Sequence, residues 1–249
     1  MWGATAAGGL PVGGRRRRWT SPRRAGPASV PAQSRPRVIG GADRTELSMG
    51  ELRAVMQAQR ACRRFDPDGD VPDPDIELIL DAAVHAPSAE NSQPWVFVVM
   101  RSAGARATLS ELWTAAWTAG GAEFVRSRTD DKVYADLDSG IMRGGFASAP
   151  VIVMVGADLD RVPEAFAPSS VYPAVQNILL AAADLGYGSC LTTGLTSTYV
   201  EPVRELLGLP ETVLPMAAIY LGRPERRPGP PRRRPATEST YREHFKAPW

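Results

Sequence analysis

The chain makes a stiff turn at residues 86–95, whose sequence is APSAENSQPW, and the apolar run Val96–Met100 follows at once. The two prolines of the turn each fix a backbone φ angle and lack an N–H donor, so the residues between them have little freedom. Ser88 and Asn91 can present a hydroxyl and an amide to the edge of a flat, polar ligand. The same two side chains can instead bond to nearby backbone, in which case the turn only connects a helix to a strand.

Two helices are expected before this turn, and strands and helices alternate after it. Strands are predicted from short, continuous apolar runs, which are typical of strands buried on both faces. Interleaved helices and buried strands predict an α+β fold, a three-layer α/β/α sandwich with a central mixed sheet flanked by helices. Helices are expected at residues 48–59, with Ser48 as N-cap, 72–85, 172–185 and 201–207, and strands at 96–100, 150–155, 189–193 and 216–222. Residues 105–143 are expected to be helical, with an interruption at Gly120-Gly121.

Composition indicates one ordinary globular domain plus a tail. No apolar run approaches the roughly 20 residues that span a bilayer, so an integral membrane protein is excluded. Cys62 and Cys190 are too few for a disulfide framework and lack the paired spacing of a zinc or redox site. We therefore expect a cytoplasmic protein.

Residues 1–47 have the composition of a disordered basic tail, and residues 48–249 form the expected domain. The tail holds nine arginines against Asp43 and Glu46, which leaves the domain mildly acidic. Nucleic acid is therefore not expected as the main partner, because a binding domain would carry clustered basic charge of its own. Three readings of the tail stay open: sequence upstream of a natural start at Met49, a solvated tail, or a transit-like leader.

Three arginines, Arg60, Arg63 and Arg64, lie within five residues near the end of the first predicted helix. Guanidinium groups offer forked, charge-assisted hydrogen bonds, so the cluster is suited to a phosphate; a solvated basic edge is the alternative. Neighbouring positive charge is expected to lower the pKa of the Cys62 thiol. No general base lies beside Cys62, so a nucleophilic role is not expected.

Two further segments are candidate ligand contacts. The strand ending at Thr193 runs into Gly194, which has no Cβ and lets a ligand approach the backbone N–H groups closely. The run Arg232–Arg234 is either a second anion site or a solvated charge run. Trp113 and Trp117 are spaced to pack on one helical face, although they can also line a substrate site. No Ser-His-Asp ordering, metal-ligand spacing or dinucleotide-binding glycine motif is present, so hydrolytic, metal-site and Rossmann readings are weak.

Taken together, these motifs resemble the FMN-dependent nitroreductase family. The resemblance runs in order through most of residues 50–235 and is carried by RACRRF (60–65), APSAENSQPW (86–95), QNILLAAADLG (176–186), GLP (208–210) and LGRP (221–224). It implies a nitroreductase-like homodimer with FMN at the subunit interface and a C-terminal tail that extends onto the partner subunit.

The resemblance also assigns cofactor-binding residues. Ala61 stands where many relatives have serine, and Pro231 where many have a basic residue, so weaker FMN binding is expected. The matching positions are Arg60, Ala61, Arg63, Arg64, Pro87, Ser88, Asn91, Thr193, Gly194 and Arg233. Arg233 lies in the run Arg232–Arg234, and the match to the motif also allows either of its neighbours.

The activity that the resemblance implies is hydride transfer from NADH or NADPH, by a ping-pong route, to a small electrophile such as a nitroaromatic, quinone or enone. No side chain is assigned as a catalytic acid or base, because the chemistry belongs to the cofactor. Two alternatives remain. One is a family member with other flavin chemistry, namely reductive dehalogenation, flavin cleavage or dehydrogenation. The other is a non-catalytic flavin-binding protein.

Overall fold

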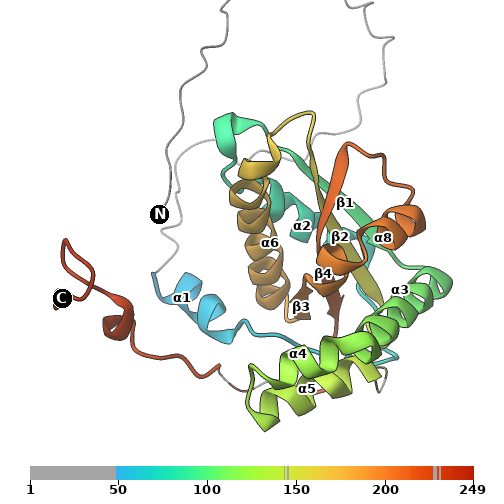
Figure 1. Ribbon diagram of the computed structural model, residues 1–249, viewed down its shortest axis with the longest axis horizontal. Helices are drawn as coiled ribbons and strands as arrows, with labels where there is room; N and C mark the ends of the chain where they lie inside the picture. Colours follow the sequence, from blue (N-terminus) through green and yellow to red (C-terminus); the bar gives the residue numbers. More distant parts are fainter. Residues whose placement is uncertain (1–48, 143, 145, 227–228, 230) are drawn as a thin grey trace, which may run out of the picture. The chain divides into compact units, whose positions relative to one another are not determined.

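The computed structural model describes residues 49–142, 144, 146–226, 229 and 231–249 (Figure 1). The expected disordered tail at residues 1–47 and the expected N-cap Ser48 lie outside the described residues. The boundary between residues 45 and 46 separates the chain into two units, and everything below concerns the second unit.

A four-stranded sheet forms the centre of this unit, in the order β1-β2-β4-β3, and neighbouring strands run antiparallel. A parallel component comes from one isolated bridge, between Ala61 and Ser189 beside β3. The strands are β1 (Trp95–Met100), β2 (Val151–Asp158), β3 (Gly188–Thr192) and β4 (Val213–Gly222).

Helices cover both faces of the sheet, as the continuous apolar strands predict. Along β2, Val153 and Val155 face one apolar cluster and Ile152 and Met154 face another. The first cluster is completed by α2 and α6, and the second by α3, α5, α7 and α8. Figure 1 shows the green helices of residues 103–142 gathered together. The three-layer prediction is therefore confirmed.

The helices are α1 (Met49–Ala58), α2 (Asp73–Val84), α3 (Ala103–Ala116), α4 (Ala122–Arg126), α5 (Asp131–Met142), α6 (Ala167–Asp184), α7 (Gly194–Thr198) and α8 (Val200–Leu207). Short 3₁₀ turns occur at Ala89–Asn91, Glu164–Phe166 and Ala236–Ser239, and a π-helical turn occupies Trp117–Gly121. Within that π turn Gly120 has a φ of 128°, so the predicted interruption of the helical stretch is confirmed.

Two elements begin earlier in the sequence than expected, and each contains a proline. Helix α6 begins five residues early and contains Pro173. Strand β4 begins at Val213 and passes through Pro215, which lies opposite a register irregularity at Gly156, where a missing N–H donor is tolerated. The short helix α7 was not expected. Across the described part of the chain, no helix is both long and apolar enough to span a membrane.

Candidate functional site

The segment that carries the arginine cluster is fixed to the edge of the sheet. Ala61 pairs with Ser189 of β3, and Cys62 N donates to Ser189 O at 2.9 Å. Further along, Phe65 pairs with Pro224, just after β4. These backbone contacts, together with the buried side chains of Cys62 and Phe65, hold residues 60–65 in place, so the guanidiniums project from a rigid base.

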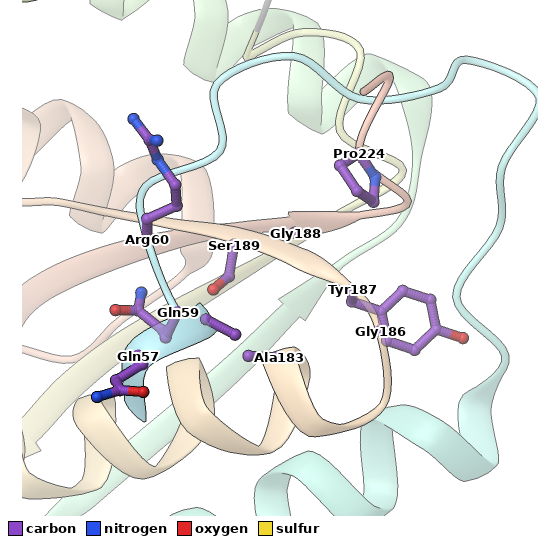
Figure 2. Close-up of a pocket in the computed structure, with 10 residues that line it drawn as sticks. Gln57, Gln59, Arg60, Ala183, Gly186, Tyr187, Gly188, Ser189 and Pro224 are labelled. Carbon is purple, nitrogen blue, oxygen red and sulfur yellow. The ribbon is translucent and has the colours of Figure 1, made fainter. Parts of the chain in front are cut away.

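Three cavities surround this segment, and Arg60 lines all of them. The first, of about 710 Å³, lies between the end of α1, the end of α6 and the start of β3, and Figure 2 shows Arg60, Gln59, Tyr187 and Ser189 around it. The other two, of about 270 and 770 Å³, are also lined by Arg63 and Arg64. The structure therefore brings the three arginines of the cluster together.

Helix α5 holds two of these arginines. Arg63 Nη1 donates to Asp136 Oδ2, and Arg64 Nη2 donates to Ser139 Oγ at 2.8 Å. Arg63 Nε is buried and has no hydrogen-bond partner among the described residues. A buried donor without a partner is costly, and a phosphate-bearing ligand with several acceptor oxygens would suit it. The residues present therefore fit such a ligand.

Sequence reasoning did not identify Asp136 or Ser139. They lie 73 and 75 residues from the arginines that they contact. Asp136 belongs to an ordinary amphipathic helix, and neither residue forms part of a recognisable motif. Only the packing of α5 against residues 60–65 reveals these contacts.

The Cys62 thiol does not have the lowered pKa that the neighbouring arginines suggest. Burial raises its pKa and outweighs the nearby guanidiniums. The thiol donates to Arg64 O at 3.2 Å. Cys62 is thus a packed part of the segment, in line with the absence of a nucleophilic role.

The turn at residues 86–95 is locally bonded and strained. Ser88 Oγ accepts from Gln93 N at 3.0 Å, and Asn91 Oδ1 accepts from Gln93 Nε2 at 3.2 Å. Glu90, Asn91 and Gln93 have φ angles of 54°, 55° and 49°. Three non-glycine residues in this left-handed region within four positions are unusual, and such strain concentrates at functional sites. The turn therefore makes local hydrogen bonds of the kind expected if it only connects a helix to a strand, and its backbone is also rigid.

The turn and the arginine segment lie toward opposite ends of the sheet. Trp95, which follows the turn, pairs with Ala157, and Ala157 pairs with Leu214 near the start of β4. Ser189, beside the arginine segment, pairs with Leu221 near the end of β4. Seven residues of strand separate the two levels, which is about 23 Å at ~3.3 Å per residue. Pro87, Ser88 and Asn91 line none of the three cavities within the described chain.

The predicted contact at Thr193 and Gly194 lies at the start of α7. A Cβ on Gly194 would come within 2.5 Å of Trp113 Cη2, so the indole already occupies the space that this glycine leaves. Trp117 is 4% exposed and donates through Nε1 to Asp138 Oδ1 at 3.0 Å, which confirms that it packs in the interior.

The C-terminal arginine run reaches the site through Arg232, which lines the 770 Å³ cavity with Arg60, Arg63 and Arg64. The side chain of Arg233 instead donates to Arg232 O at 3.0 Å. The arginine that lines the cavity is thus Arg232, one residue before Arg233, which best matched the family motif. The sequence analysis allowed either neighbour of Arg233.

Comparisons with known proteins show which family this chain resembles. The profile of the nitroreductase family matches residues 56–223. A protein of Archaeoglobus fulgidus named as a candidate NADH dehydrogenase/NAD(P)H nitroreductase is 32% identical over 178 residues, which is 71% of this chain and 87% of that protein.

Solved structures show the same fold. A nitroreductase of Bacteroides fragilis with bound FMN is 25% identical, with a TM-score of 0.53, and the match covers 70% of this chain and 88% of the other. Iodotyrosine deiodinase bound to FMN and 3-iodo-L-tyrosine is 21% identical, with a TM-score of 0.63 and coverage of 78% and 99%.

Proposed function

The chain belongs to the nitroreductase family, and we propose that it is an FMN-dependent oxidoreductase that takes a hydride from NADH or NADPH and passes it, by a ping-pong route, to a small electrophile. Nitroaromatics, quinones and enones are the acceptor classes proposed. The observation that carries this proposal is the grouping of Arg60, Arg63 and Arg64 around shared cavities, with the Nε of Arg63 buried and without a partner.

The chemistry that bound FMN supplies is hydride transfer at its N5 atom, first from the nicotinamide and then to the acceptor. The protein's part is binding and orientation. Arg60, Arg63 and Arg64 would hold the phosphate or the pyrimidine edge through charge-assisted hydrogen bonds, joined by the run that contains Arg233. Ala61 would lie along the same segment. Backbone N–H groups at Thr193 and Gly194 would lie near the reactive edge of the ring, although Trp113 fills the space beside the Gly194 Cα.

We propose that the working unit is a homodimer, in which Pro87, Ser88 and Asn91 complete the site of the partner copy. The separation of about 23 Å along the strand direction, at ~3.3 Å per residue, supports this, because one chain does not bring the turn to its own arginine segment.

Exposed apolar side chains offer surface for such an assembly. Leu52 and Met56, on the predicted apolar face of α1, are 45% and 53% exposed. In the C-terminal tail, Phe245 and Trp249 are 77% and 71% exposed. Apolar surface of this kind is typical of interfaces, and we propose that α1 and the tail contact the partner subunit.

A cytoplasmic location is proposed because both cysteines are free thiols, as they would be in a reducing compartment.

The test begins with purified protein supplied with FMN. A yellow holoprotein that NADH or NADPH bleaches under anaerobic conditions, and that an acceptor panel re-oxidises, is the expected result. A colourless protein that neither takes up FMN nor oxidises a nicotinamide would refute the proposal. Release of halide from halogenated aromatics, without turnover of nitroaromatics, quinones or enones, would favour reductive dehalogenation instead.

The arginine cluster can be tested separately by replacing Arg63 with alanine. The dissociation constant for FMN should rise at least tenfold, because a charged hydrogen bond contributes roughly 1.5–3 kcal/mol. Arg101→Ala is the matched control, since Arg101 pairs with Asp70 and Asp73 and lines none of the three cavities. Unchanged FMN affinity in Arg63→Ala would move the cofactor site elsewhere.

A further inference from the structure

Asp136 is the one carboxylate that lines both the 270 and the 770 Å³ cavities among the described residues. Its Oδ2 atom accepts a hydrogen bond from Arg63 Nη1. The Arg63 side chain is 18% exposed and that of Asp136 is 47% exposed. A negative group therefore lies inside a cluster that is otherwise suited to anions.

The contact is oriented by close packing of α5. A Cβ on Gly140, one turn beyond Asp136, would lie 3.2 Å from Arg63 Cβ, so this glycine lets the helix approach the stem of Arg63. Asp136 binds Nη1, which leaves the Nε of the same guanidinium without a partner. Ser139 holds Arg64 on the same helix, but through a neutral hydroxyl.

We propose that Asp136 is a positioning residue of the cofactor site, which orients Arg63 so that its remaining guanidinium donors face the ligand and which offsets part of the positive charge of the cluster. The two effects act in opposite directions on the binding of an anion: orientation strengthens it, and the added negative charge weakens it. The inference rests on the proposed binding of FMN.

Two substitutions separate these effects. Asp136→Asn keeps an oxygen that can accept from Nη1 but removes the charge, so FMN should bind about threefold more tightly than in the wild type. Asp136→Ala removes the charge and the acceptor together, so FMN should bind about tenfold more weakly than in Asp136→Asn. Asp136→Glu, which keeps the charge and an acceptor, should restore affinity to within about twofold of the wild type.

Affinity is measured by equilibrium ultrafiltration of the cofactor-free full chain with FMN, after thermal unfolding has shown that each variant is folded. Asp131→Asn is the matched control: Asp131 lies on the same helix, has a side chain that is 98% exposed, and lines none of the three cavities. The ion-pair partner of Asp131 is Arg126, which lies outside the arginine cluster, so the FMN affinity of Asp131→Asn should change less than about twofold.

If the FMN affinities of Asp136→Asn and Asp136→Ala both rise or both fall relative to the wild type, the inference is overturned, because a merely structural residue gives that result. A change in FMN affinity in Asp131→Asn equal to that in Asp136→Asn would also overturn it. If the wild type takes up no FMN, the proposed function fails. The affinities of the wild type and the Asp136 variants are then measured with inorganic phosphate as the probe. Opposite shifts of the two Asp136 variants then still support the positioning role, and shifts in one direction reject it.

Discussion

Ala61 and Ser189 are 128 positions apart in the sequence, yet they pair as a parallel bridge at the edge of the sheet. The bridge makes the arginine segment a short addition to the edge strand β3, held by backbone bonds and by the buried side chains of Cys62 and Phe65. A ligand site on such a base keeps its geometry when single side chains change. Variants of Arg60, Arg63 or Arg64 are therefore expected to report on binding rather than on folding.

Replacing Gly194 with alanine should destabilise the protein. The new methyl group would lie 2.5 Å from Trp113 Cη2, so either the indole or the start of α7 must move, at a cost of about 1–3 kcal/mol in the free energy of unfolding. Urea denaturation measures this cost, and adding Trp113→Leu should recover part of it. Gly104→Ala in α3 is the control, because a Cβ there meets nothing within 4 Å. Equal stability of Gly194→Ala and the wild type would mean that Trp113 does not fill this space.

The strain in the turn predicts opposite effects of glycine at two exposed glutamates. Glu90 has a φ of 54°, so Glu90→Gly should stabilise the protein or be neutral, because it removes a left-handed penalty of about 1–2 kcal/mol. Glu77 lies inside α2, and Glu77→Gly should cost about 1 kcal/mol. Free energies of unfolding in urea compare the two. A larger loss in Glu90→Gly than in Glu77→Gly would contradict the strained geometry.

The order of helices and strands could be predicted from the sequence because a strand buried on both faces is a continuous apolar run. The runs Val96–Met100 and Val151–Val155 are continuously apolar, and both became strands that separate two apolar clusters. The start of α6 was harder to predict, since Pro173 suggests a boundary although the surrounding packing of the helix tolerates it.

The candidate site could be predicted only as separate pieces. Charge density marked Arg60, Arg63 and Arg64, and the structure brings them to common cavities. Asp136 could not be found, since its meaning depends on a contact with Arg63 that no local pattern encodes. The relation of the turn to the arginines could not be found either, because it depends on strand register across the whole sheet.

Both cysteines should resist thiol reagents in the native protein. Burial raises the pKa of Cys190 to about 11 and also raises that of Cys62, so little reactive thiolate is present at neutral pH. Ellman's reagent at pH 7.5 should react slowly with native protein and rapidly with two thiols in denaturant. Cys62→Ser should leave one rapidly reacting thiol under the same denaturing conditions. A thiol that reacts as fast in native as in unfolded protein would show that its site is open.

The contact between Tyr187 and Asp75 predicts a loss of stability in alkali. The Tyr187 hydroxyl donates to Asp75 Oδ2 at 2.5 Å, and burial, followed by this bond, raises the pKa of Tyr187 to about 12 from a usual value of 10. The folded state thus holds the phenolic proton more tightly than the unfolded state. The resulting stabilisation is fully present below pH 10 and is lost as the pH rises toward 12.

Tyr187→Phe removes this contribution, so the difference in free energy of unfolding between wild type and variant should be largest below pH 10 and shrink at higher pH. Urea denaturation at intervals between pH 8 and pH 11.5 measures it. The pKa of Tyr220 is also raised by burial, and that contribution cancels because both proteins retain Tyr220. Asp75→Asn keeps an acceptor but removes the carboxylate charge, so its stability should fall at a lower pH than that of the wild type. A constant difference between wild type and Tyr187→Phe across the whole range would show that Tyr187 does not titrate in this way.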